Sequence, residues 1–482
     1  MSLRKSALSG MFWTFVQQMS TQGITFIVSI ILARLLLPEE FGLIALLSVF
    51  MNVGNTLVNS GLSKSLIRTS NPDDDDFSSV FWFNMFISII MYLLMYFLAP
   101  LVADFYNQAI LILLLRLYSV VFIINSFVIV QNTRLTKEMD FKKQTIITIP
   151  SILMGSIVGI TMAYTGYGVW SLVWAAIVKS TTLSIQLWFL SPWYPLFRLK
   201  KEKIKYHLNF GYKLTLAGII DTLFQDIYTI IIGKFFNPLE VGFFNRANTL
   251  RQFPVRNFTT VINQVTFPLF SKIQNDDYKL KNAYKKIMKM AVFIITPTLL
   301  FMAALAEPLF RFLLTEKWMP AVPYFQIICL GSLFAPISIY NLNILTVKGY
   351  SNLHLKLSII KKVFIVLVIL ISINWGIYGL LYGQIFLSIT GFFINGWYSK
   401  KLINYSSIEQ LIDVLPNIIL TLVIAIGIKI FDGFVNLLFN DLIRIILGGG
   451  IGMFIYITIS YFIKLESLNE LKLILMRKNL KG

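Results

Sequence analysis

Two stretches of the chain, ARLLLPEEFGL (residues 33–43) and GKFFNPLEVGF (residues 233–243), share one pattern. Each has a basic residue, three further residues, and then Pro-x-Glu-x-Gly at the end of a long apolar run. Proline cannot continue a helix and glycine permits a tight turn, so the pattern predicts where one helix ends and the next begins. Its recurrence 200 residues later predicts that the chain contains two copies of one helical unit.

The composition predicts a membrane protein. Hydrophobic residues make up 56% of the 482 residues, charged residues make up 13%, and the mean hydropathy is +0.73. A water-soluble surface needs about 25% charged residues, which this chain cannot supply. A bilayer core requires about 20 apolar residues per helix. Runs of that length predict an all-α, polytopic fold with about 14 membrane-spanning helices, at approximately 9–37, 41–63, 78–103, 109–133, 145–165, 168–190, 213–236, 247–270, 287–313, 322–346, 355–374, 377–398, 414–431 and 442–463.

The basic residues predict the orientation. With an even number of spans both termini lie on one side, and the segments on that side hold 31 of the 42 Lys and Arg residues, Lys361 among them. By the positive-inside rule this side is the cytoplasm. Basic loops beside anionic lipid explain the pI of about 9.7 without a nucleic-acid partner. The first apolar run has no cleavage pattern and is expected to be a retained helix.

Weaker sequence similarities between segments about 200 residues apart also predict a duplication. Spans 1 to 6 and 7 to 12 are expected to form two pseudo-symmetric six-helix lobes of the same orientation, as in transporters that rock two lobes about a central site. The predicted parts are an N-terminal lobe (1–190), a basic cytoplasmic linker (191–212), a C-terminal lobe (213–400) and a segment with two further spans and a cytoplasmic tail (401–482).

Polar residues follow one face of four predicted spans, with spacings of three and four. A polar side chain is costly in hydrocarbon and therefore turns toward protein or water. Helix-to-helix hydrogen bonding explains a single polar face, whereas four matching faces favour a hydrophilic central cavity. The amide-bearing residues on these faces are Gln18 and Gln22, Asn52 and Asn55, Gln225, and Gln252.

Charges within or beside the spans refine this prediction. Arginine presents a planar fork suited to phosphate oxygens, so the cavity is expected to bind an anion. Arg34 and Lys234 have a second interpretation, in which they extend to the membrane interface, and Arg256 equally fits structural pairing. The candidate substrate-binding cations are Arg34, Arg116, Lys179, Lys234, Arg246, Arg251 and Arg256.

Asp221 and Asp226 are the carboxylates well inside a span. They fit a proton or sodium relay that couples transport to an ion gradient, or salt bridges to cavity arginines.

Asp73 to Asp76 form an acidic run that is expected to be solvated, with metal attraction as the other interpretation. The chain has one cysteine, Cys329, and no recognisable catalytic, metal or nucleotide motif, so no enzyme activity, cofactor or metal is predicted.

The segments Leu32 to Gly42 and Asp226 to Phe243 resemble the polysaccharide flippases of the multidrug/oligosaccharidyl-lipid/polysaccharide exporter superfamily. The run TFPLFSKIQNDD (266–277) and the pairs Glu307 with Pro308 and Trp318 with Pro323 are similar to that family as well. The resemblance covers almost the whole chain. The resemblance implies that Arg34, Arg256 and Asp226 occupy functional positions of the family. Lys234 departs from the family, because many relatives have a non-basic residue at that position.

This resemblance implies a protein of the bacterial cytoplasmic membrane that moves undecaprenyl-pyrophosphate-linked repeat units of O-antigen or exopolysaccharide to the outer leaflet. It implies alternating access, coupling to H⁺ or Na⁺, and functional association with glycosyltransferases and a glycan polymerase. Two alternatives stay open. A multidrug antiporter of the same superfamily would favour an acidic cavity, and a membrane-embedded glycan polymerase or acyltransferase would need larger external loops.

Overall fold

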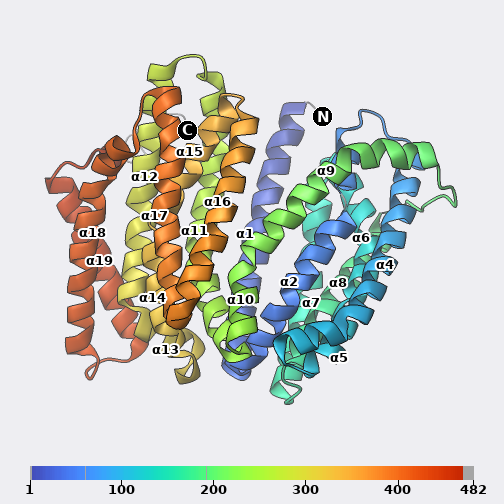
Figure 1. Ribbon diagram of the computed structural model, residues 1–482, viewed down its shortest axis with the longest axis horizontal. Coiled ribbons are helices and arrows are strands. Elements are labelled where there is room, and N and C mark those ends of the chain that lie inside the picture. The colour runs from blue at the N-terminus through green and yellow to red at the C-terminus, as the bar shows by residue number, and fades with distance from the viewer. Residues whose placement is uncertain (1–2, 60, 192, 471–482) are drawn as a thin grey trace. The chain divides into compact units, whose positions relative to one another are not determined.

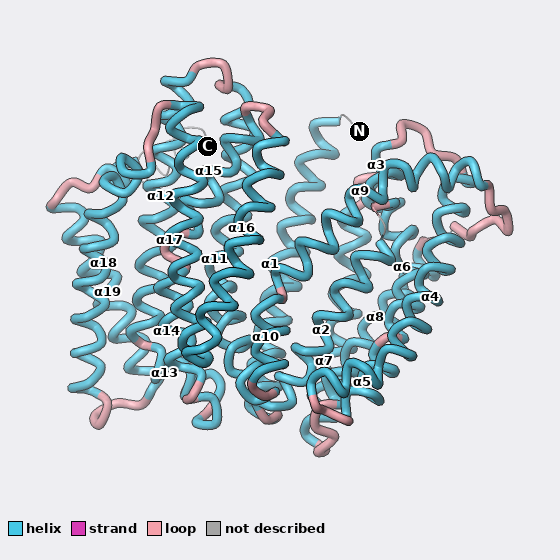
Figure 2. The backbone as a smooth tube through the Cα atoms, viewed as in Figure 1, coloured by secondary structure: helices cyan, strands magenta, loops and turns pink. Residues whose placement is uncertain are grey.

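The computed structural model describes residues 3–59, 61–191 and 193–470. All regular secondary structure in these residues is helical, which confirms the predicted all-α fold (Figure 1; Figure 2). The chain divides into two compact units, Met1–Gly242 and Phe243–Gly482. This division falls at Gly242, whereas the sequence placed its linker at 191–212. The six-helix lobes stay a prediction about topology, and the end of the predicted tail, 471–482, lies outside the described residues.

The first unit is built from ten helices and the first turn of an eleventh, within the residues described. Its helices are α1 (Leu3–Leu35), α2 (Pro38–Asn59), α3 (Leu62–Arg68), α4 (Asp74–Tyr106), α5 (Ile110–Tyr118), α6 (Val120–Lys137), α7 (Phe141–Tyr164), α8 (Trp170–Leu190), α9 (Lys201–Gln225), α10 (Ile227–Phe235) and the start of α11 (Pro238–Lys272). In this unit α7 packs on α8 and α1, and α9 packs on α2, α3 and α4.

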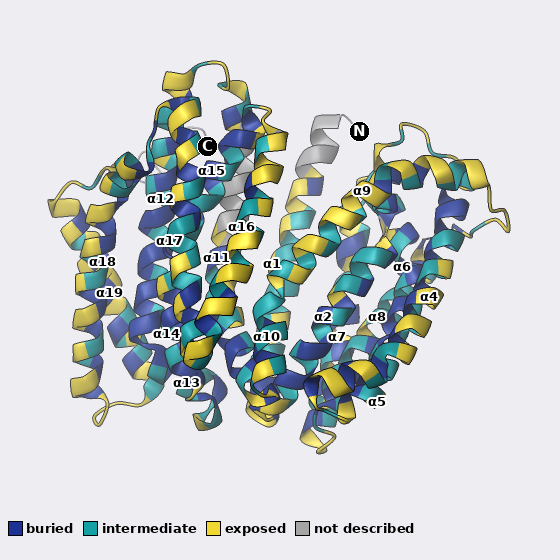
Figure 3. Ribbon diagram, viewed as in Figure 1, coloured by how far each residue is buried: buried dark blue, intermediate teal, exposed yellow. Residues whose placement is uncertain are grey.

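The second unit continues α11 and ends with a helical pair. Its further elements are α12 (Asp277–Ala304), α13 (Ala306–Leu314), η1 (Glu316–Trp318), α14 (Ala321–Gly331), α15 (Ala335–Val347), α16 (Ser351–Ser372), η2 (Ile373–Trp375), α17 (Gly376–Ile403), α18 (Ser407–Val435) and α19 (Asp441–Phe462). Figure 3 shows exposed residues along α18 and α19, and many are large and apolar, such as Val423 and Phe454. Such a surface suits contact with lipid chains.

Each predicted span coincides with one helix or with two consecutive helices. Ten of the described helices are long and apolar enough to cross a membrane, or up to 12 if the two bent pairs are each one span. The count of fourteen is therefore not confirmed. One reason is that α16, η2 and α17 form a single apolar segment of 52 residues, Asn352–Ile403. Another is α11, whose hydropathy is lowered by Arg246, Arg251 and Arg256.

The two copies of Pro-x-Glu-x-Gly pack against each other within the first unit. Pro38 begins α2 and Pro238 begins α11. A Cβ on Gly42 would overlap the carbonyl oxygen of Pro238, and a Cβ on Gly242 would overlap the carbonyl oxygen of Pro38. The contact is reciprocal. The repeated Pro-x-Glu-x-Gly sequence therefore brings the starts of α2 and α11 so close together that only glycine fits at these two positions.

The acidic run begins α4 and binds the segment before α9, so it is not merely solvated charge. Asp73 caps α4 through a reciprocal capping box with Asp76. Asp74 accepts a hydrogen bond from the indole of Trp193 at 3.1 Å, and Asp75 pairs with Lys200. Residues 201–212 of the predicted linker form the first half of α9, and this half is attached to α4 of the same unit.

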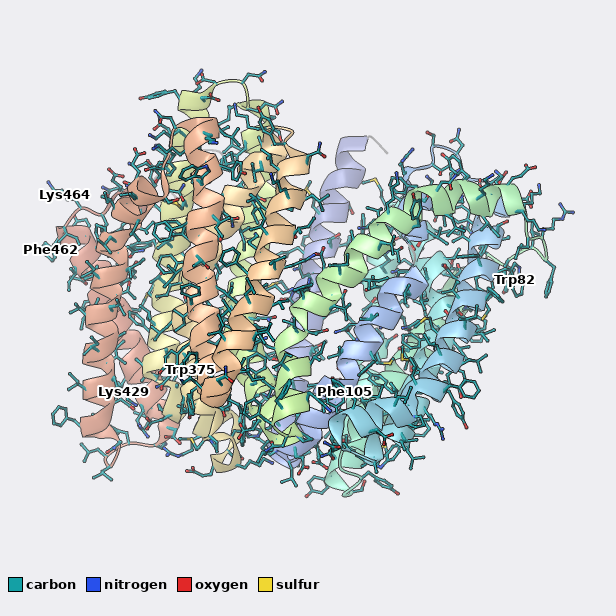
Figure 4. All side chains as sticks on the ribbon, viewed as in Figure 1. Trp82, Phe105, Trp375, Lys429, Phe462 and Lys464 are labelled. Carbon is teal, nitrogen blue, oxygen red and sulfur yellow. The ribbon has the colours of Figure 1, made fainter. Side chains whose placement is uncertain are left out.

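Ion pairs attach the α18 and α19 pair to the rest of the second unit. Lys429 on α18 pairs with Glu307 on α13 at 2.6 Å, and Asp413 near the start of α18 pairs with Lys285 on α12 at 2.8 Å. Figure 4 shows Lys429 and Trp375 toward one end of this unit, and Phe462 and Lys464 toward the other. The two C-terminal helices are therefore fixed to α12 and α13 at both ends.

Candidate functional site

A break in a membrane helix places Asp226 at a distinctive position. α9 ends at Gln225, α10 starts at Ile227, and the two are bent by 47°. The half-buried carboxylate of Asp226 accepts a hydrogen bond from the Asn52 amide at 2.9 Å. Broken membrane helices create polar sites because some backbone N–H and C=O groups near the break have no hydrogen-bond partner within the helix. The structure thus brings together two predicted site residues, Asn52 and Asp226.

The polar faces predicted on spans 2 and 7 form a seam between α2 and α9. The hydroxyls of Thr56 and Thr222 lie 3.2 Å apart, one helical turn from the contact between Asn52 and Asp226. Gly218 permits this approach, since a Cβ there would lie 3.0 Å from the methyl group of Thr56. Part of each polar face therefore joins helices, as the alternative interpretation holds.

Other residues of these polar faces are half-buried or exposed within their own unit. In the first unit Asn55 is half-buried on α2, Gln18 and Gln22 are half-buried on α1, and Asp221 and Gln225 are exposed on α9. The neighbouring Gln17 donates to Thr148 of α7 at 3.2 Å. In the second unit Gln252 and Arg256 are exposed on α11.

Three predicted cations have structural contacts within their own unit. Arg116 donates to the carbonyl oxygen of Tyr96 at 3.3 Å and lies 4.2 Å from the centroid of that ring. Lys234 donates to the carbonyl oxygen of Phe105 at 2.8 Å, near the C-terminus of α4, where a positive charge is favourable (Phe105 is labelled in Figure 4). Arg246 is 6% exposed and lies 5.3 Å from the Trp318 ring. These contacts account for the charges without a substrate.

Arg34, Arg251 and Arg256 occupy different surroundings. Arg34 is exposed in the last turn of α1, and Arg256 is exposed on the polar face of α11. Arg251 is half-buried and donates to Asn248 on its own helix. Its Nε is buried and has no hydrogen-bond partner among the described residues. Such a group requires water or a further acceptor, so Arg251 remains compatible with a polar ligand.

Two lysines stand at the middle of membrane helices. Lys179 is exposed on α8, and Lys361 is half-buried on α16. Neither has a hydrogen-bond or ion-pair partner in the part of the chain that the structure describes. The sequence placed Lys361 with the cytoplasmic charges, but α16 begins ten residues before it, at Ser351. Sequence reasoning missed this residue because the polar start of α16 conceals where the helix begins.

Several buried polar clusters could not be predicted from the sequence. In the second unit the amide oxygen of Asn341 accepts from Tyr284 at 2.7 Å and from Ser399 at 2.6 Å. Arg444 donates two hydrogen bonds to Asp432, each 2.8 Å. Each contact joins two different helices, those of Asn341 over more than 50 residues of sequence, so the periodicity within one helix does not reveal them.

Two hollows of the second unit lie away from the predicted residues. An apolar groove of about 600 Å³ between α16 and α17 is lined by aromatic side chains including Trp375, Tyr378 and Tyr382. A pocket of about 480 Å³ beside α12 is lined by Lys285, Lys289 and polar residues of 466–470. Among the described residues there is also no group of three or more His, Cys, Asp or Glu arranged to hold a metal ion.

A family model described as polysaccharide biosynthesis protein matches residues 31–323 of the chain. The chain belongs to the polysaccharide biosynthesis protein family. The matched segment contains both Pro-x-Glu-x-Gly copies and the helix break at Asp226. The predicted relationship to the polysaccharide exporters of the superfamily is confirmed by this match and by the similarities below.

Relatives with related names cover most of the chain. An uncharacterized membrane protein in the cps region of Klebsiella pneumoniae is 24% identical, over 94% of each chain. The lipopolysaccharide biosynthesis protein WzxC of Escherichia coli (strain K12) is 23% identical, over 77% of this chain and 76% of its own. The succinoglycan biosynthesis transport protein ExoT of Rhizobium meliloti is 23% identical, over 68% and 66%.

Solved structures share the fold. The lipid II flippase MurJ, in an inward closed conformation, aligns with a TM-score of 0.75 over 95% of this chain and 99% of its own, at 15% identity. A multidrug resistance MATE family transporter of the MOP superfamily, in an inward-facing conformation, aligns with a TM-score of 0.62 over 82% of this chain and 99% of its own, at 16% identity. Together these findings establish a multi-pass membrane protein with a transporter fold.

Proposed function

We propose that this chain is a flippase that moves a lipid-linked oligosaccharide across the cytoplasmic membrane by alternating access. The cargo is an oligosaccharide repeat unit joined through pyrophosphate to undecaprenol, and both termini lie in the cytoplasm. The family, the names of WzxC and ExoT, and the fold shared with a lipid II flippase support the transport of a glycan lipid. The excess of basic residues in the predicted cytoplasmic segments supports the orientation.

The observation that carries this proposal is the pair of unpartnered lysines at mid-span. Lys179 and Lys361 each lie about 15 Å from both ends of their helix, given a rise of 1.5 Å per residue. A lysine side chain is much shorter than that distance and cannot extend to the membrane interface. A charge at such a depth needs an anionic partner or water, and the described residues supply no acid. We infer that each lysine, in its own unit, faces water or an anionic cargo.

The remaining predicted residues have graded roles in this proposal. Arg256 and Gln252 on α11 contribute exposed polar groups to the second unit, and Gln225 on α9 contributes one to the first unit. Arg34 supplies charge near the end of α1. Arg116, Lys234 and Arg246 are assigned to structure because of their contacts with Tyr96, Phe105 and Trp318. The proposed association with glycosyltransferases and a glycan polymerase follows from the cargo.

Coupling to an H⁺ or Na⁺ gradient is assigned to Asp226. Its carboxylate lies at the break between α9 and α10 and contacts the Asn52 amide, which supplies a neutral oxygen nearby. A carboxylate, an amide oxygen and loosened backbone carbonyls are the ligands that a small cation or a proton uses in membrane transporters. Protonation or cation binding would weaken the hydrogen bond from Asn52 and so loosen the α2–α9 seam.

A flipping assay tests the proposal. Purified protein is reconstituted into liposomes that contain a polyprenyl-pyrophosphate-linked disaccharide with a fluorescent label on the sugar. Wild type is expected to move the label between leaflets, which an impermeant quencher reports. Arg256→Ala is expected to abolish flipping and remain folded, whereas the control Arg116→Ala retains it. No flipping by wild type would contradict the proposal, and proton-driven uptake of a cationic dye instead would favour the multidrug alternative.

A further inference from the structure

A buried cluster of hydrogen-bonded side chains lies where the first half of α9 packs on α3 and α4. His207 on α9 is fully buried, and Ser65 on α3 and Asp76 on α4 are 3% and 4% exposed. The His207 Nδ1 lies 2.8 Å from the Ser65 hydroxyl, and its Nε2 lies 3.2 Å from Asp76 Oδ1. Lys203 contacts Asp73 and Asp76, each at 3.0 Å. Both nitrogens of the imidazole are thus engaged.

This arrangement accepts a proton without rearrangement. In neutral His207 the Nε2 proton is donated to Asp76, and the Ser65 hydroxyl donates to Nδ1. In the protonated form Nδ1 also carries a hydrogen, and the Ser65 hydroxyl needs only to rotate to accept it. Each heavy-atom distance suits both states, because a serine hydroxyl is both a donor and an acceptor.

The charge balance of the cluster leaves room for one proton. Asp73 and Asp76 carry two negative charges, while Lys203 supplies one positive charge, so neutral His207 leaves one negative charge uncompensated. Protonated His207 balances the cluster. Burial opposes this charge and lowers the pKa of His207, while the hydrogen bond and the negative charge of Asp76 act in the other direction.

Other charged groups around the cluster have partners of their own. Arg68 on α3 lies over the Phe210 ring, and Lys200 before α9 pairs with Asp75. On α6, Lys137 donates to carbonyl oxygens at the end of α3, and Arg134 lies over the Trp193 ring. The Tyr206 ring packs edge-on against the His207 ring, and Tyr206 itself is an exposed residue.

We propose that His207, Asp76 and Ser65 form a proton-binding site whose occupancy strengthens the attachment of the first half of α9 to α3 and α4. Gly61 and Gly211 already bring these backbones together, since a Cβ on Gly61 would lie 2.8 Å from the carbonyl oxygen of Gly211. The segment before α9 is held to α4 as well, through the Leu196 amide and Ser78 at 2.9 Å. This proton site goes beyond the proposed function and is independent of the cargo.

The first test measures the proton directly. The chain has two histidines, so protein labelled with ¹⁵N-histidine and purified through a histidine-free tag gives two imidazole signals in lipid vesicles. A His354→Gln variant assigns them, and the exposed His354 is the matched control. Burial lowers the pKa of His207 and the hydrogen bond with Asp76 opposes this shift, so we expect the His207 signal to titrate on the acid side of a free imidazole. Asp76→Asn shifts this titration to lower pH. A His207 signal that does not titrate in wild type would overturn the proposal, even if the variant fails to fold.

The second test measures the attachment. Hydrogen exchange of residues 193–210, corrected for the intrinsic effect of pH, is expected to become at least about tenfold faster when His207 loses its proton, corresponding to about 1.4 kcal/mol. In His207→Gln the protection of this segment should not depend on pH in that range. A histidine-free segment at the start of α18 serves as the internal control. Titration of His207 without any change in exchange would exclude its role in attaching α9.

Discussion

Arg444 and Lys361 are both cations inside membrane helices of the second unit, and their surroundings differ. Arg444 is 5% exposed, donates two hydrogen bonds to Asp432 and a third to Asp441 at 2.8 Å. Lys361 has no hydrogen-bond or ion-pair partner within the described ranges. A buried charge with full pairing holds the fold together, whereas a charge left without an acid at mid-span needs water or an anionic ligand. The comparison separates structural cations from candidate functional ones.

The largest expected effect is on the paired charge. Arg444→Ala leaves Asp432 buried without its partner, and removing one member of a buried ion pair typically costs about 3–5 kcal/mol. We expect a marked fall in the unfolding temperature of the purified protein in detergent. Lys361→Ala, measured in parallel, should not lower this temperature. An unchanged unfolding temperature for Arg444→Ala would contradict the structural role of the pair.

The next prediction concerns an uncharged backbone contact, that of Gly42 with Pro238. Gly42→Ala places a methyl group where the carbonyl oxygen of Pro238 lies, and overpacking of this kind typically costs about 1–3 kcal/mol. The matched control is Gly427→Ala on α18, where nothing lies within 4 Å of the added carbon. We expect thermal stability to fall for the first variant and to stay level or rise for the second. Equal behaviour would show that the two helix starts are not held in contact.

The unpaired charge should matter for transport alone. Lys361→Ala is expected to lower the flipping rate of the pyrophosphate-linked disaccharide at least about tenfold, equivalent to about 1.4 kcal/mol. Its unfolding temperature should stay close to that of wild type, since no hydrogen bond or ion pair among the described residues is lost. Lys234→Ala is the control, because that lysine caps α4 through Phe105. Full activity of Lys361→Ala would remove this residue from the path.

The smallest expected effect concerns an exposed paired carboxylate. A hydrogen bond from the Asp76 backbone N–H, and then the contact with Lys203, lower the pKa of Asp73 to about 2. Because this folded pKa is below the unfolded value, the stabilisation is fully present above the unfolded pKa of 3.8 and is lost as pH falls through about 2. Asp73→Ala should cost about 1 kcal/mol at neutral pH, as for other N-caps. A loss that persists unchanged at acidic pH, measured by urea unfolding, would contradict this assignment.

The fold could be predicted to a large extent from the sequence. Apolar runs located every membrane helix or helix pair, because length and hydropathy are local properties. The repeated phrase predicted two helix junctions, and the structure adds that Gly42 and Gly242 meet each other. That contact was not predictable, since no local pattern states which helix starts pack together.

The candidate site was predictable only in part. Periodicity found the polar faces and so identified Asn52 and Asp226, which the structure places in contact. Charge alone could not distinguish Arg116, which lies on the Tyr96 ring, from Lys179, which lacks a partner among the described residues. The distinction depends on the three-dimensional neighbours of each cation. For the same reason the sequence did not show that Asp76 of the acidic run shares a buried hydrogen bond with His207 of the predicted linker.

The most direct test of the account asks whether the mid-span lysines are hydrated. The chain has a single cysteine, Cys329, which is fully buried, so an introduced thiol can be followed in an almost cysteine-free background. Lys361→Cys and Lys179→Cys are treated in membranes with a charged, impermeant thiol reagent, and Val423→Cys, on an exposed apolar face of α18, is the control. The account predicts that both lysine positions react and that position 423 does not. Failure of the two lysine positions to react any faster than position 423 would contradict it.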